Sequence, residues 1–90
     1  MVHWSMHKVE FSQHAQAQMK ERGIPTHLIL TTLEYPDKTA SQTNGTKRRI
    51  KRFKRNGKDY VLVVVYRELA AATRVVTIFF TSKVRKYLIG

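Results

Sequence analysis

The dipeptide Asn56-Gly57 stands between two long stretches of strand-forming sequence, and it restricts the fold more than any other feature. Asn-Gly is the preferred sequence of a two-residue type I′ turn, in which both central residues take positive φ. The flanking segments, KRRIKRFKR and KDYVLVVVY, are long enough to form extended strands. The sequence therefore predicts a β-hairpin of defined register, with Phe53 opposite Tyr60.

The first strand of this hairpin, Lys47–Arg55, carries seven cations in nine residues, and only Ile50 and Phe53 are apolar. In the predicted register Ile50 lies opposite Val63 on one face of the sheet, and Phe53 lies on the other face. One apolar contact on each face is expected to anchor the strand while the cations project from it. Lysine and arginine also protect edge strands from aggregation, but one or two suffice for that.

Seven cations instead predict contacts with phosphate groups, because their mutual repulsion is relieved by a polyanion. The predicted nucleic-acid contacts are the cations of the strand and one from the C-terminal tail: Lys47, Arg48, Arg49, Lys51, Arg52, Lys54, Arg55 and Lys83.

The second strand, YVLVVVY, is apolar on both faces, which is typical of a central, buried strand. TRVVTIFFTS predicts a third strand, and PDKTASQT favours a short edge strand before the hairpin. On the third strand, simple alternation places one set of residues on a single face: Thr73, Val75, Thr77, Phe79 and Thr81.

Two helices are predicted upstream of the hairpin. The first runs over Ser12–Arg22, because Ser12 is a good N-cap and Gly23 suits the left-handed residue that ends a helix. Arg22 falls on the apolar side of this helix, so its guanidinium is expected to reach out to solvent or to meet an anion. A second helix is expected from Pro25 to Pro36.

These elements predict an α+β fold in which two N-terminal helices pack on one face of a three- to four-stranded antiparallel sheet. A chain of 90 residues allows one domain, 1–90, and residues 1–10 are expected to be loosely ordered. The C-terminal segment TSKVRKYL favours either a last helical turn or a final edge segment.

The formal charge of +11 predicts an anionic partner: nucleic acid, an anionic membrane face or an acidic protein. The chain has no cysteine, and His3 and His7 lack the further ligand that a metal site needs, so no metal and no cofactor are expected. No apolar run has the length of a signal peptide or of a membrane span. The sequence therefore predicts a soluble, cytoplasmic protein.

RNA can be cleaved without a metal by an acid, a base and cations that stabilise the negatively charged transition state. His14 is the histidine expected within an ordered helix at helical spacing from a basic residue, Arg22, and histidine changes charge near neutral pH. A half-buried packing role for His14 fits the same spacing. Thr77, in the middle of a strand, has a hydroxyl that needs a partner if it is buried.

The segments FSQHAQAQMKERGI, LEYPDK, YVLVVVY and VVTIFF together resemble the small family catalogued as a domain of unknown function of type 4258. That family is usually grouped with the RelE-like, barnase-like ribonuclease folds of bacterial toxin–antitoxin pairs. The likeness extends from Phe11 to about Leu88, and its most specific pieces are His14-Ala15, Met19 and Arg22-Gly23-Ile24.

The resemblance implies a RelE-like fold and a catalytic site made of His14, Arg22, Tyr66 and Thr77. Relatives often have a basic residue where this chain has Gln18. It also implies RNA as the substrate, ribosome-associated mRNA included, and an acidic antitoxin as the protein partner.

The leading hypothesis is a toxin-like, metal-independent endoribonuclease. In it His14 transfers protons, Arg22 with Arg49 or Lys51 stabilises negative charge, and Tyr66 and Thr77 position the phosphate or the imidazole. The alternative is a non-catalytic basic module that binds RNA or DNA, with Lys47–Arg55 on phosphates and Phe53 or Tyr60 stacked on bases. A third hypothesis is a basic accessory protein that binds an acidic partner and never contacts nucleic acid.

Overall fold

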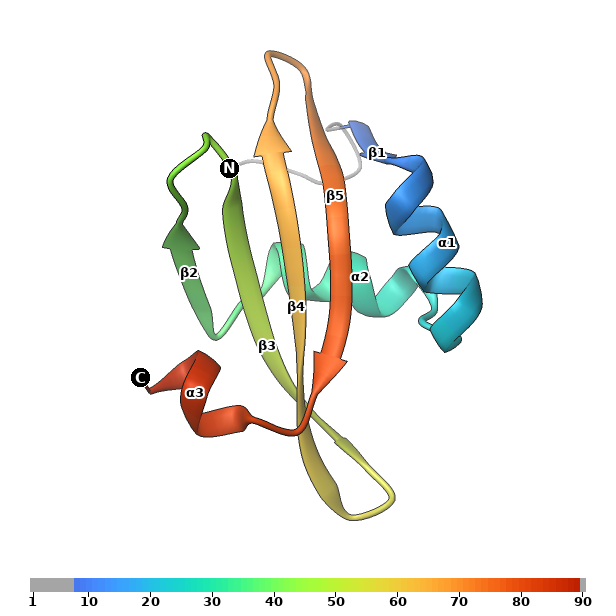
Figure 1. The fold of residues 1–90 in the computed structure, drawn as a ribbon, viewed down its shortest axis with the longest axis vertical. Helices are drawn as coiled ribbons and strands as arrows, with labels where there is room; N and C mark the ends of the chain where they lie inside the picture. Colours follow the sequence, from blue (N-terminus) through green and yellow to red (C-terminus); the bar gives the residue numbers. More distant parts are fainter. Residues whose placement is uncertain (1–7, 90) are drawn as a thin grey trace.

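The computed structural model describes residues 8–89, in which a five-stranded sheet forms the centre of the molecule (Figure 1). Its strands stand in the spatial order β1-β5-β4-β3-β2. The elements follow the chain as β1 (Lys8–Phe11), α1 (Gln13–Arg22), α2 (Thr26–Glu34), β2 (Lys38–Ser41), β3 (Lys47–Arg55), β4 (Lys58–Glu68), β5 (Ala72–Thr81) and α3 (Val84–Leu88).

The predicted hairpin is confirmed as β3 and β4, and its end projects beyond the rest of the sheet (Figure 1). Asn56 and Gly57 both take positive φ, 52° and 79°, as a type I′ turn requires. Phe53 lies opposite Tyr60, so the register is the predicted one. Ile50 packs in the core of one face of the sheet and Phe53 against the core of the other.

Both predicted helices are present. The Ser12 hydroxyl accepts a hydrogen bond from the backbone N–H of Ala15 at 3.0 Å, and Gly23 ends α1 with φ of 63°. In α2 the residues Ile29, Thr32 and Leu33 are buried against the sheet. Arg22 is exposed, so of the two predicted outcomes, solvent or an anion, its side chain reaches solvent in this structure.

The predicted sheet of three to four antiparallel strands is wrong, because the sheet is mixed and has five strands in residues 8–89. β1 pairs in parallel with β5, with Lys8 opposite Ala72 and Phe11 opposite Val75. Residues 8–10 belong to this strand, although they were expected to be loosely ordered. The segment KVEF gives a weak strand signal because it is only four residues long and partly charged. In the fold it forms hydrogen bonds with the outer edge of β5, whose backbone groups would otherwise be unpaired.

The prediction that helices cover only one face of the sheet is also wrong. α2 lies behind the sheet in the view of Figure 1, whereas α3 lies at its lower left and packs on the other face. The apolar side chains of α3 pack on residues of β3 and β4 that face away from α1 and α2. A strand such as β4, with Val61–Tyr66 buried throughout, needs cover on both faces.

A β-bulge shifts the pairing of β4 with β5 between Val65 and Tyr66. Val65 lies opposite Thr77 and Tyr66 opposite Val75, so Val76 is the extra residue. The alternation predicted for the third strand fails at this point. Val75 packs in the core beneath α1 and α2, while Phe79 packs on the α3 face.

Candidate nucleic-acid interface

The basic strand β3 presents its side chains alternately to the two faces of the sheet. On the α2 face, the first half of the strand is bound to the protein itself. Arg49 donates a hydrogen bond from Nη1 to the carbonyl oxygen of Leu33, and Lys51 donates from Nζ to that of Tyr35 at 2.9 Å. Both acceptors lie at the C-terminal end of α2.

These two bonds supply what the sequence of α2 lacks. The last turn of α2 contains no basic residue, although the final carbonyls of a helix need donors and its negative dipole end favours cations. Arg49 also places its Cζ 5.2 Å from the ring centroid of Tyr66. The first half of β3 therefore fastens α2 to the sheet.

Lys47, at the start of β3, pairs with Glu68 at the end of β4. The Nζ to Oε1 distance is 2.7 Å, and both side chains are about half exposed. The hydrogen bond to Glu68, together with its negative charge, raises the pKa of Lys47 above the ordinary lysine value. This cation is thus also engaged within the protein.

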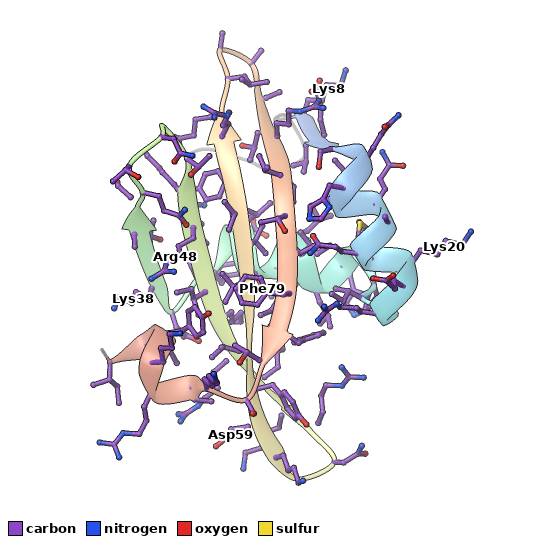
Figure 2. The ribbon with its side chains drawn as sticks, viewed as in Figure 1. Lys8, Lys20, Lys38, Arg48, Asp59 and Phe79 are labelled. Carbon is purple, nitrogen blue, oxygen red and sulfur yellow. The ribbon has the colours of Figure 1, made fainter. Side chains whose placement is uncertain are left out.

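Arg48 points to the other face of the sheet, where α3 lies (Figure 2). Its Cζ is 5.4 Å from the ring centroid of Tyr87, which in turn meets Phe79 edge to face at 5.8 Å. The Nε atom of Arg48 is buried without a hydrogen-bond partner within residues 8–89. Arg48 therefore serves chiefly to hold α3 on the sheet.

The second half of β3 has few internal partners. Arg52 lies 3.9 Å from the carboxylate of Asp59, a long contact between side chains 55% and 41% exposed. Arg55 rests over the ring of Phe80 at 5.1 Å. The side chains of Lys54 and, across the turn, Lys58 are exposed and form no hydrogen bond or ion pair with any part of the chain that the structure describes.

Two hollows adjoin this end of the hairpin and share Arg55. One, of about 330 Å³, lies between the α1–α2 corner and the sheet and is lined by Gly23, Pro25, Leu28, Phe53, Lys54, Arg55 and Phe80. The other, of about 370 Å³, is lined by Arg55, Asn56, Lys58 and Tyr60. Both have the size of small ligand sites and combine cations with aromatic rings.

The predicted catalytic residues do not form one cluster. His14 and Arg22 are exposed on α1, which packs mainly against β5 and β1. β4 stands between β5 and the basic strand β3. Only the C-terminal corner of α1, at Gly23, reaches the hollow beside the basic strand.

Tyr66 and Thr77 are placed differently again. Tyr66 is 1% exposed, and its hydroxyl has no hydrogen-bond partner among the residues described. It lies against Arg49, so these two predicted site residues do come together. The Thr77 hydroxyl donates to Oε1 of Gln18 at 2.8 Å, and the backbone N–H of Ile78 donates to the same oxygen at 2.8 Å.

Gln18 thereby continues the edge of the sheet where β1 has ended. Its side-chain oxygen takes the place of a strand carbonyl beside β5 and gives the half-buried Thr77 hydroxyl its acceptor. Gln18 and Thr77 therefore join α1 to the sheet.

Lys83, predicted as a nucleic-acid contact, is exposed at the start of α3, and its backbone N–H donates to the Thr81 hydroxyl at 3.1 Å. It lies outside both hollows. In residues 8–89 no group of three or more potential metal-binding side chains occurs, and no helix there is long and apolar enough to cross a membrane. The histidine pair at positions 3 and 7 lies outside the described residues.

Residues 11–80 match the family model described as "Domain of unknown function (DUF4258)". The chain belongs to the DUF4258 family. The matched range contains the four predicted catalytic residues, the whole of β3 and both hollows, and it ends before Lys83 and α3. No match was found among curated proteins or among solved structures.

Several residues of this candidate interface carry no obvious sequence signal. Phe80 and the corner residues Gly23 and Pro25 line the first hollow, but they are far from β3 in sequence. Only the pairing of β5 with β4 and the packing of α2 bring them there. Phe53 and Tyr60 were found from the hairpin register, which depends on a local turn.

Proposed function

We propose that this protein binds nucleic acid and that the end of the β3–β4 hairpin is the contact surface. The observation that carries the proposal is a set of exposed cations around two hollows that contain aromatic rings. The set consists of Lys54, Arg55 and Lys58, with Phe53, Tyr60 and Phe80 in the hollows. Cations supply affinity for phosphate, and aromatic rings supply a surface for bases.

Charge supports an anionic partner. The chain has 17 Lys and Arg against 6 Asp and Glu, a formal charge of +11. In the first half of β3, Lys47 pairs with Glu68, and Arg49 contacts the Tyr66 ring and a carbonyl oxygen of α2. Among the cations of β3, those at the hairpin end have the fewest internal partners, and this end projects away from the body of the molecule (Figure 1).

The test is binding of a fluorescently labelled single-stranded RNA, followed by anisotropy over a series of salt concentrations. The logarithm of affinity is expected to fall linearly with the logarithm of salt, with a slope of about 0.7 per phosphate contact. Lys58→Gln should lower both the affinity and the slope. Lys20→Gln, which removes the same charge from a side chain of α1 that extends away from the sheet (Figure 2), should change the slope little.

Failure of the wild-type protein to bind RNA or DNA at low salt would refute the proposal. It would leave the third hypothesis, a protein that binds only an acidic partner.

Cleavage of the RNA separates a binding module from the endoribonuclease predicted from the sequence. Arg49 contacts Tyr66, and in residues 8–89 neither the Arg49 Nε nor the Tyr66 hydroxyl, both buried, has a hydrogen-bond partner. Buried polar groups without partners favour the hypothesis of a catalytic site here. His14 lies on α1, which packs on β5 and β1, and β4 separates these strands from β3. This arrangement argues against one site that contains both His14 and the basic strand. The grouping with RelE-like, barnase-like ribonucleases and the acidic antitoxin both stay predictions.

RNA incubated with the protein in excess chelator tests that prediction. Product formed by the wild type and lost in His14→Ala would support the endoribonuclease. Product that His14→Ala forms at the wild-type rate would remove His14 from the site, and binding without product would leave the binding module.

A further inference from the structure

The hollow between the α1–α2 corner and the hairpin has two chemically different parts. Its floor is apolar and comes from three elements: Leu28 of α2, Phe53 of β3 and Phe80 of β5. On the hairpin side it is lined by Lys54 and Arg55, and of these Arg55 lies on the same face of β3 as Phe53 and brings its positive charge to the rim. A site for phosphate alone would not need an apolar floor, and a site for an aliphatic chain would not need the cations.

The opposite wall is the turn between α1 and α2, where Gly23 and Pro25 offer little side-chain bulk. Apart from the backbone around Gly23 itself, no heavy atom in the part of the chain described lies within 4 Å of the place where a Cβ of Gly23 would stand. This wall therefore adds little bulk to the hollow, and the aromatic side chains of Phe53 and Phe80 line it.

Arg55 connects this hollow with its neighbour. The guanidinium rests over the ring of Phe80, with Cζ 5.1 Å from the ring centroid, and Arg55 also lines the second hollow with Lys58 and Tyr60. Phe53 and Tyr60 stand opposite each other on β3 and β4, one lining each hollow. Two adjacent aromatic sites with one arginine between them match two bases and the phosphate that joins them.

We infer that the two hollows hold two neighbouring unpaired nucleobases, the first at the α1–α2 corner and the second at Tyr60, with Arg55 on the intervening phosphate. This inference rests on the proposed nucleic-acid binding and adds its substrate class: single strands. Bases within a duplex are stacked and paired, so their faces are not available to Phe53, Phe80 or Tyr60. Stacking on an aromatic side chain depends little on the identity of the base.

The test compares three labelled probes at one salt concentration with the wild-type protein: a single-stranded oligonucleotide, the same backbone with abasic sites, and the duplex of the same sequence. Base stacking contributes about 1–3 kcal/mol per base, which corresponds to about a fivefold to hundredfold change in affinity. Loss of affinity of at least this size is expected for the abasic probe, and weaker binding for the duplex.

Equal affinity for the intact and abasic strands would overturn the inference and leave the phosphate contacts of the proposed function in place. A duplex that binds as tightly as the single strand would do the same. No binding of any probe at low salt would refute the proposed function as well.

Substitution of the aromatic residues tests where on the protein the bases bind. Phe53→Leu and Tyr60→Leu should each weaken single-strand binding about fivefold or more without changing the salt slope, because stacking releases no counterions. Tyr35→Leu removes an aromatic ring that is 63% exposed elsewhere and should leave the affinity unchanged. Folding of each variant is checked by circular dichroism and thermal unfolding, and folded Phe53 and Tyr60 variants with wild-type affinity would overturn the assignment.

Discussion

The two halves of β3 have nearly the same composition and different surroundings. Lys47–Lys51 contains four cations, and these contact Glu68, Tyr87, Tyr66 and the end of α2. Arg52–Arg55 contains three cations with one long ion pair and one ring contact between them. The density of charge along a sequence therefore does not reveal its use, because the neighbouring elements decide which cations remain available.

The difference follows from what lies over each half. The end of α2 reaches the first half of β3 and presents carbonyl oxygens to it. The second half runs into the projecting end of the hairpin, where hollows replace packed helix (Figure 1). The first half is thus expected to govern stability, and the second half is expected to govern binding.

The largest effect on stability is expected from Ile50→Ala in the first half. Ile50 is fully buried in the core beneath α3, and truncation of a buried isoleucine to alanine costs about 2–5 kcal/mol. Chemical denaturation measures the loss. A cost below 1 kcal/mol would mean that the first half of β3 is not a structural anchor.

Arg49→Gln should cost about 1–3 kcal/mol of unfolding free energy, because it leaves the Leu33 carbonyl at the end of α2 without its charged donor. Lys54→Gln is the matched control in the second half and should change stability by no more than about 0.5 kcal/mol. The same denaturation measurement serves both variants. Equal losses for the two would erase the difference between the halves.

A small, pH-dependent effect is expected at Lys47. Its pKa is raised in the folded protein by Glu68, so the pair contributes stability at neutral pH and loses it as the pH rises through the raised lysine pKa. Stability of the wild type should therefore decline in that alkaline range more than stability of Glu68→Gln does. Parallel pH profiles of the two proteins would show that the pair contributes nothing.

Local patterns predicted the elements that local chemistry controls. Asn56-Gly57 gave the hairpin and its register, and Ser12 and Gly23 gave the limits of α1. The parallel strand β1 was missed because four residues with two charges carry little strand signal, and its partner β5 lies more than sixty residues away. The bulge at Val76 reversed the faces of β5, which no local pattern marks.

The second layer over the sheet was within reach of the sequence. The segment VLVVV of β4 is apolar on both faces, so it requires cover on the face opposite α1 and α2 but does not say that a helix supplies it. The candidate interface was only partly predictable. The cations were evident from the sequence. Which of them contact the protein itself and which stay exposed depends on the position of the C-terminal end of α2 in the fold.

The most direct test compares two double variants that each remove two positive charges from β3. Lys47→Gln with Lys51→Gln alters the first half, and Lys54→Gln with Arg55→Gln alters the second. Single-strand RNA binding over a salt series should show a slope lowered by about 0.7 per lost contact in the second-half variant and a nearly wild-type slope in the first-half variant. Equal reductions in slope would contradict the account, because binding would then follow net charge rather than the position of the cations at the hairpin end.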